Sequence, residues 1–357
     1  METQQYRKGN RAVATWLIIG VVMIIVQVIL GGITRLTGSG LSITEWEVVT
    51  GSFPPMNEAH WLAEFRKYQE TPQYRLLNTD FTLSDFKFIY FWEWFHRVWA
   101  RLIGIVFLVG FIWLTAKKYL RKDMVNPLLV LFILGAVQGA VGWIMVASGL
   151  TGDAVYVKPT RLALHFILAL LLLCYTWWFA LQLLIPAQQR ILSPPIKKLT
   201  IVLLVLMTVQ LIYGALMAGH RAATVAPTWP TINGDWLPAT LWQDNPLLLN
   251  LIDNPITIHF IHRNLAYLIV ILVIIWYRKM SQAEITPLIG RWKRFPLILT
   301  VIQVLLGIFS VLTSKDIIPN HWGNFEWMAQ LHQIVAMILL LSMVSLLYLF
   351  HKQRQQA

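Results

Sequence analysis

The sequence predicts an all-α membrane protein in which eight transmembrane helices form two pseudo-symmetric four-helix bundles. Hydrophobic residues make up 57% of the 357 residues and charged residues only 13%, which excludes an ordinary soluble domain. Eight apolar runs are long enough to cross a bilayer, which takes about 20 helical residues. Four histidines inside these runs, His96, His165, His262 and His332, recur in register between the two halves of the chain.

The eight expected spans are joined by loops of very different length. The first run is too long for the core of a signal peptide, and no small-residue cleavage site follows it, so we expect it to be retained as a span. In the long loop after this span, the segment Glu58–Tyr74 predicts a surface helix at the membrane interface. The expected spans are Ala12–Gly31, Phe88–Leu114, Pro127–Val146, Leu162–Ile185, Leu199–Ala218, Ile256–Tyr277, Phe295–Thr313 and Trp327–Phe350.

Charge is distributed along the chain as in a multi-pass membrane protein. The formal net charge is +12, a balance that taken alone could indicate nucleic-acid binding. However, 17 of the 29 lysines and arginines lie in the two tails and the even-numbered loops, whereas 13 of the 17 acidic residues lie in the odd-numbered loops. This positive-inside pattern predicts that both termini are cytoplasmic. We therefore expect the chain to contact membrane lipid and to bind no nucleic acid.

Segments of the first half recur in the second half. The matching segments are Gln27–Gly31 with Gln210–Gly214, Glu93–Ala100 with His259–Ala266, and Gln138 with Gln303. Because each repeat holds an even number of spans, both halves have the same orientation, which indicates a parallel duplication. We expect an N-terminal bundle at 1–190, with the long outer loop, and a C-terminal bundle at 191–357.

The topology brings the four histidines together in pairs. All four lie near the outer ends of even-numbered spans, so His96 with His165 and His262 with His332 would form two sites side by side. A histidine in a bilayer is costly and usually functional, and imidazoles from facing helices are normal axial ligands of haem iron. No thiolate or carboxylate cluster at zinc-like spacing competes with this interpretation. Hydrogen bonding within the bundles is the alternative.

The two halves differ three residues before the first histidine of each pair. Glu93 precedes His96 on the same helix face, whereas His259 stands at the equivalent place before His262. A carboxyl group there could transfer a proton or stabilise a cationic intermediate. The alternative is a structural ion pair with a neighbouring arginine. This asymmetry predicts that one site reacts and that the other holds an electron-transfer haem.

An arginine directly follows the first histidine of each pair. Arg97 follows His96, and Arg263 follows His262. A buried arginine needs an anion, and a haem propionate is the expected one. Packing against Glu93 or a backbone carbonyl is the alternative for Arg97.

The first half contains four motifs that can be compared with known families. They are Gly31-Gly32-Ile33-Thr34-Arg35-Leu36-Thr37-Gly38-Ser39-Gly40-Leu41-Ser42, Leu76-Leu77-Asn78, Phe86-Lys87-Phe88-Ile89 and Glu93-x-x-His96-Arg97. In combination they resemble the haem A synthase family, most closely the branch shared by mitochondria and many Gram-negative bacteria. The resemblance covers nearly the whole chain. It implies oxidation of the C8 methyl group of haem O to a formyl group by successive hydroxylation, which gives haem A for cytochrome oxidase.

The resemblance also implies roles for the two halves. His96 and His165 would hold haem O, the substrate, with Glu93 as the essential acid, whereas His262 and His332 would hold a haem b. Haem O synthase would supply the substrate, and an unidentified partner would exchange electrons with the protein. The sequence leaves open whether the chain forms a homo-oligomer. The expected location is the bacterial inner membrane.

One departure from the wider family, and two other functions, affect this interpretation. The Gram-positive branch has cysteine pairs in its outer loops, but this chain has only Cys174, inside a span, so no thiol redox step is expected. A di-haem membrane cytochrome that only carries electrons would explain the histidines but not the difference between Glu93 and His259. A transporter built from parallel repeats would use the histidines as proton relays.

Overall fold

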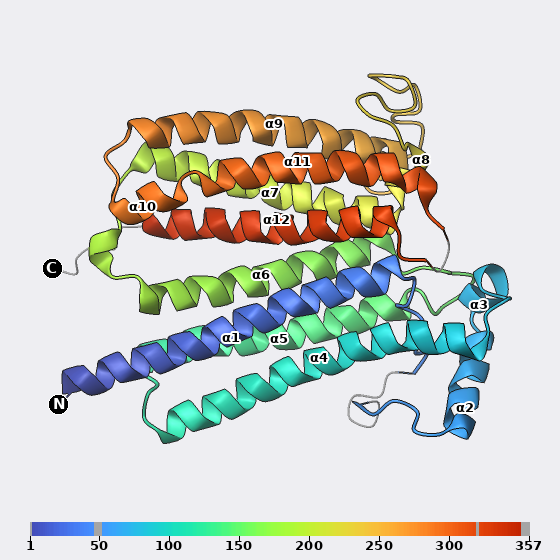
Figure 1. Cartoon of the computed structure of the whole chain (residues 1–357), viewed down its shortest axis with the longest axis horizontal. Helices are drawn as coiled ribbons and strands as arrows, with labels where there is room; N and C mark the ends of the chain where they lie inside the picture. The colour runs from blue at the N-terminus through green and yellow to red at the C-terminus, as the bar shows by residue number, and fades with distance from the viewer. Residues whose placement is uncertain (1, 46–51, 319–320, 351–357) are drawn as a thin grey trace.

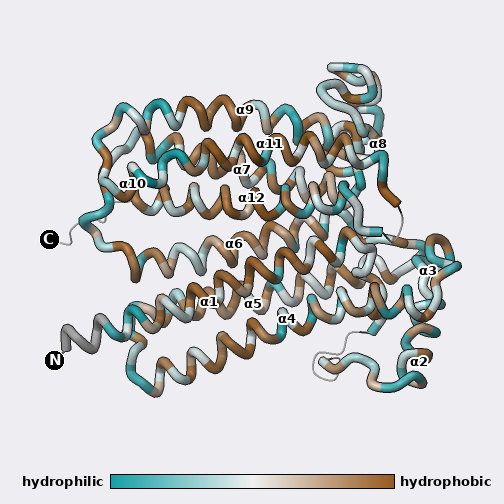
Figure 2. Tube along the Cα trace, viewed as in Figure 1, coloured by the Kyte–Doolittle hydropathy of each residue, from teal (hydrophilic) through white to brown (hydrophobic). Residues whose placement is uncertain are grey.

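The computed structural model describes residues 2–45, 52–318 and 321–350. Eight helices in this part of the chain are long and apolar enough to cross a membrane, which confirms the eight predicted spans. The helix ends lie within about five residues of the predicted ends, except that α1 begins ten residues earlier than predicted. Figure 1 shows them side by side along the long axis of the molecule, and Figure 2 shows hydrophobic residues along their middle sections. These helices are α1 Glu2–Leu36, α4 Leu83–Ala116, α5 Lys122–Ala147, α6 Pro159–Leu184, α7 Pro194–Gly219, α9 Pro255–Gln282, α11 Phe295–Thr313 and α12 Asn324–Leu349.

Local sequence explains where several of these helices begin. Thr82 caps α4 and forms a capping box with Asp85, so the helix starts five residues before the predicted apolar run. Proline occupies the first turn of α6, α7 and α9, where its missing N–H costs no hydrogen bond. Asn254 additionally accepts hydrogen bonds from the N–H groups of Ile256 and Thr257 at the start of α9.

The helices of each half lie together, and the halves meet along α1, α6, α7 and α12. Gln333 of α12 donates a hydrogen bond to the Val28 carbonyl of α1 at 2.9 Å, and Gln330 donates one to the Ile29 carbonyl at 3.3 Å. A Cβ at Gly32 would clash with Gln330 Oε1, so a glycine at this position lets both amides reach α1. The contact therefore joins the first half to the helix that carries His332.

Short helices lie in the connections. The helix predicted at Glu58–Tyr74 is confirmed but divided: α2 covers Glu58–Gln69, and α3 covers Pro72–Leu77 with Thr71 as its N-cap. Its position at a membrane interface stays a prediction. The other short elements are the 3-10 helices η2 Ala187–Gln189, η3 Leu247–Leu251 and η4 Ser314–Asp316, with α8 Ala222–Val225 and α10 Pro287–Trp292. Residues 351–357, with the basic C-terminal tail, lie outside the described residues.

Candidate functional site

Each of the four predicted histidines faces a glutamine on a neighbouring long helix. The amide nitrogen of the glutamine lies 3.2 or 3.3 Å from the histidine Nε2 in every case. The same contact therefore occurs four times, twice in each half of the chain. The pairs are Gln27 with His96, Gln138 with His165, Gln210 with His262 and Gln303 with His332.

A glycine one helical turn after each glutamine leaves space for the same imidazole. A Cβ on these glycines would lie only 2.8–3.3 Å from the histidine Cε1, so a larger residue would push the ring away. The glycines are Gly31 against His96, Gly142 against His165, Gly214 against His262, and Gly307 against His332. Sequence reasoning had found Gly31 and Gly214 through the repeat, but it missed Gly142 and Gly307.

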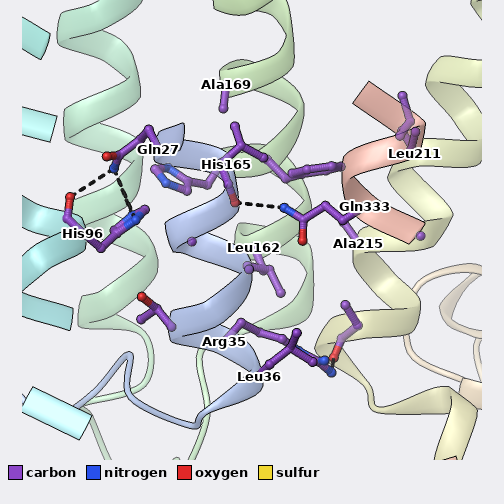
Figure 3. Close-up of a pocket in the computed structure, with 18 of the residues that line it drawn as sticks. Gln27, Arg35, Leu36, His96, Leu162, His165, Ala169, Leu211, Ala215 and Gln333 are labelled. Atoms are coloured by element: carbon purple, nitrogen blue, oxygen red, sulfur yellow. Dashed lines mark hydrogen bonds between the residues drawn. The ribbon is translucent and has the colours of Figure 1, made fainter. Parts of the chain in front are cut away.

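All four histidines line one cavity of about 1650 Å³ that passes between the two halves. Figure 3 shows His96 and His165 among its lining residues, together with Gln333 from the other half. The ring centres of His262 and His332 are 6.4 Å apart. Metal–imidazole bonds of about 2 Å would place two rings on one metal with their centres roughly 6 Å apart. The second pair therefore has the spacing that a metal between two axial imidazoles requires.

Unsatisfied polar atoms also indicate that this cavity accepts a ligand. Among the described residues, the side-chain oxygens of Gln27, Gln138, Gln210 and Gln303 are buried without a hydrogen-bond partner, as is His262 Nδ1. Buried polar atoms are normally hydrogen-bonded, so such orphans need an explanation. Across the described residues, no group of three or more His, Cys, Asp or Glu side chains gathers as a metal site. The donor set thus fits a haem with two axial histidines rather than a zinc ion.

Glu93 lies buried on α4, one turn before His96, and only 2% of it is exposed. Its Oε1 pairs with Arg97 Nη2 at 2.6 Å. Its Oε2 accepts hydrogen bonds from Ser42 Oγ at 2.7 Å and from the Ile43 N–H at 2.9 Å. The ion pair considered as the alternative for Glu93 and Arg97 is therefore present. Sequence reasoning missed the contacts from Ser42 and Ile43.

The outer segment formed by α2 and α3 contacts the loop that carries Ser42 and Ile43. Gln73 of α3 donates hydrogen bonds to the carbonyls of Gly38 and Val155, at 3.3 and 3.4 Å. Tyr68 donates one to Gln73 Oε1 at 3.1 Å and packs against Phe86. Burial is the main cause that raises the pKa of Tyr68 to about 12. The segment thus braces the backbone that contacts Glu93.

The second half has a different set of partners at the equivalent place. Arg263 Nη2 lies 2.8 Å from His259 Nε2, and the same guanidinium donates to the carbonyls of Thr228, Pro230 and Thr231. His259 is 1% exposed. A neutral imidazole in place of a carboxylate leaves Arg263 to be satisfied by backbone carbonyls of the outer loop. The predicted role of Arg97 and Arg263 toward haem propionates stays a prediction.

Fold and site together define a multi-pass membrane protein with two histidine pairs on one shared cavity, in which Glu93 lies one turn before the first histidine of one pair and His259 takes that place in the other. The profile of the COX15-CtaA family, described as cytochrome oxidase assembly protein, matches residues 14–344. The chain therefore belongs to the COX15-CtaA family, as the resemblance of its motifs predicted.

Relatives of known name match most of the chain. A haem A synthase of Flavobacterium johnsoniae is 37% identical over 97% of this chain and 100% of its own length. A haem A synthase of Paracoccus denitrificans is 40% identical over 87% of this chain and 83% of its own length. A third haem A synthase, from Rhodospirillum centenum, is 43% identical over 76% of this chain and 74% of its own length.

Proposed function

We propose that this chain is a haem A synthase, which oxidises the C8 methyl group of haem O to a formyl group by successive hydroxylation and so yields haem A for cytochrome oxidase. The observation that carries the proposal is the buried Glu93 beside His96, in a site whose second-half counterpart has His259. An electron carrier with two equivalent haems has no need of this difference. The extent of similarity to named haem A synthases supports the same conclusion.

In this proposal, the first half binds and orients the substrate. His96 and His165 hold haem O through its iron, and the facing Gly31 and Gly142 leave room for their rings. Glu93 lies three residues from His96, about 4.5 Å along the helix axis. Oxidation of a porphyrin methyl group builds positive charge at that carbon, which a fixed carboxylate stabilises or relieves by accepting a proton.

The contacts of Glu93 suit this role because they fix both carboxylate oxygens. Arg97 holds Oε1, while Ser42 and Ile43 hold Oε2. A preorganised group does not have to reorient when charge develops, so its stabilisation is available at once.

In this proposal the second half would hold a haem b through His262 and His332. When bound, this group supplies one-electron transfer between the reacting site and an external partner that stays unidentified. Arg97 and Arg263 would lie near the haem propionates. Haem O synthase would supply the substrate. The charge pattern supports a bacterial inner-membrane protein with both termini on the cytoplasmic side.

Co-expression with a haem O synthase tests the proposed function. Cells that make haem O and carry this chain should accumulate haem A, detected by extraction and chromatography of their haems. Cells that carry Glu93→Gln should accumulate haem O instead, although the variant reaches the membrane in equal amount. If neither the wild-type cells nor the Glu93→Gln cells contain haem A, the proposal is contradicted and a di-haem electron carrier is favoured.

A further inference from the structure

The two halves differ in how the helices away from the junction between the halves pack against each other. In the second half, α9 and α11 lie against each other, whereas in the first half α4 packs on α1, and α5 on α6, with hardly any contact between α4 and α5. All four helices lie wholly within the described residues. In the most apolar 18-residue stretch of α4 and of α5, only 6% of the residues are buried. The corresponding share is 28% in α9 and 22% in the span that contains α11. The first bundle is therefore open toward lipid between α4 and α5.

The shared cavity extends into this opening. Its lining continues along α4 as far as Phe111, fifteen residues beyond His96, and on α5 it begins at Val125. At a rise of 1.5 Å per residue, the stretch of α4 from His96 is about 22 Å long. In the second half, the described lining ends at Val270 on α9, eight residues beyond His262, and begins only at Thr300 on α11.

Glycines keep the extension wide. Gly104 on α4, and Gly135 and Gly139 on α5, line the cavity, and a Cβ on any of them would meet no atom within 4 Å. At the offsets that align the histidines and glutamines, the second half has larger residues in these places. They are Val270 for Gly104, Thr300 for Gly135 and Val304 for Gly139.

The walls of the extension are apolar. Beyond Arg101, α4 contributes Gly104, Phe107, Leu108 and Phe111, and α5 contributes residues such as Leu129 and Phe132. Phe111, Leu108, Leu129 and Phe132 are all more than a third exposed, which places them at the boundary between cavity and lipid. A hydrocarbon chain could lie here without leaving any polar group unpaired.

We infer that this α4–α5 groove binds the farnesyl chain of haem O, an inference that rests on the proposed function. One end of the groove reaches His96 and His165, and the other opens to lipid, so a haem on the two histidines can extend its chain into it. Haem b lacks this chain, and the half proposed to hold haem b lacks the groove. The groove is therefore a specificity determinant that separates substrate from resident haem.

Filling the groove with the residues of the second half tests the inference. Gly104→Val and Gly139→Val add bulk where no neighbouring atom lies, so folding should be kept. The matched control is Ala140→Val, on the same helix as Gly139, at an exposed position outside the cavity lining. Purified protein in lipid nanodiscs is titrated with haem O and, separately, with haem b. Loss of the titration in His96→Ala shows that the first-half site is being measured.

The expected result is a loss of haem O affinity by about tenfold or more in both glycine variants, because buried methylene groups no longer find space. Binding of haem b at the same site, and all binding by Ala140→Val, should stay unchanged. Unchanged haem O binding, or an equal loss for both haems, would overturn the inference. Gly135→Thr gives the same comparison if either valine variant fails to accumulate.

The same proteins separate this inference from the proposed function. If wild-type protein prefers haem O over haem b but forms no haem A, the proposed reaction is contradicted, whereas the inference about the groove is still supported. Wild-type protein that forms haem A while the valine variants bind haem O normally would contradict the groove alone.

Discussion

Arg97 Nη2 lies 2.6 Å from Glu93 Oε1, one helical turn apart on α4, and both side chains are largely buried. The equivalent positions in α9 hold Arg263 and His259, whose nitrogens lie 2.8 Å apart. The same register thus gives a compensated charge pair in the first half and a cation beside an imidazole in the second. Of these two arrangements, only the first offers a carboxylate one turn from a histidine of a proposed haem site.

Arg97→Met should destabilise the protein by about 3 kcal/mol or more, because it leaves the Glu93 carboxylate buried without its cation. Thermal unfolding in detergent measures the loss. The double variant Glu93→Gln with Arg97→Met should recover most of it, since no unpaired charge remains. Equal instability of the single and double variants would show that Arg97 stabilises the fold through its other contacts.

The proposed division between the halves predicts opposite effects of histidine substitutions. His262→Ala or His332→Ala should remove the low-spin haem b spectrum, because one axial imidazole is lost. His96→Ala should abolish haem A formation while that spectrum is largely kept. Difference spectra of purified protein and haem extraction provide the two measurements. A haem b spectrum that survives both second-half substitutions would contradict the assignment of the halves.

Much of the architecture could be predicted from local sequence. A run of about 20 apolar residues has few alternatives to a span, and four histidines in repeated register are visible without a structure. The division of the outer helix at Pro72 also had a signal that was overlooked, since the residue before a proline disfavours the helical conformation. Thr71 is extended and caps α3.

Other parts of the site depend on which helices become neighbours. Gly142 and Gly307 look like ordinary packing glycines until their helices lie against His165 and His332. Ser42 reaches Glu93 from 51 residues earlier in the chain, and nothing in the local sequence marks that contact. The open side between α4 and α5 likewise follows from packing that apolar periodicity does not distinguish from a closed bundle.

Alkaline pH should loosen the outer segment through Tyr68. Burial is the main cause that raises its pKa from 10.0 to about 12, so the fold favours the neutral phenol. This stabilisation is complete below the unfolded pKa of about 10 and is lost as pH rises through about 12. Proteolysis of the segment around α2 and α3 should therefore accelerate over that interval. In Tyr68→Phe the segment should be more susceptible at neutral pH, with a weaker alkaline increase, whereas an identical pH profile would contradict the argument.

Gly307→Ala should disturb haem binding in the second half without unfolding the protein. A Cβ at this position would lie 2.9 Å from His332 Cε1, so the ring must move or α11 must shift, at a cost of about 1–3 kcal/mol. Because the His332 ring would leave its position opposite His262, the low-spin spectrum should weaken and haem should dissociate more easily. Gly290→Ala is the matched control, since its Cβ would meet only Ile285 at 3.9 Å. Equal spectra and equal haem retention in the two variants would mean that the four glycines serve helix packing rather than the placement of the imidazoles.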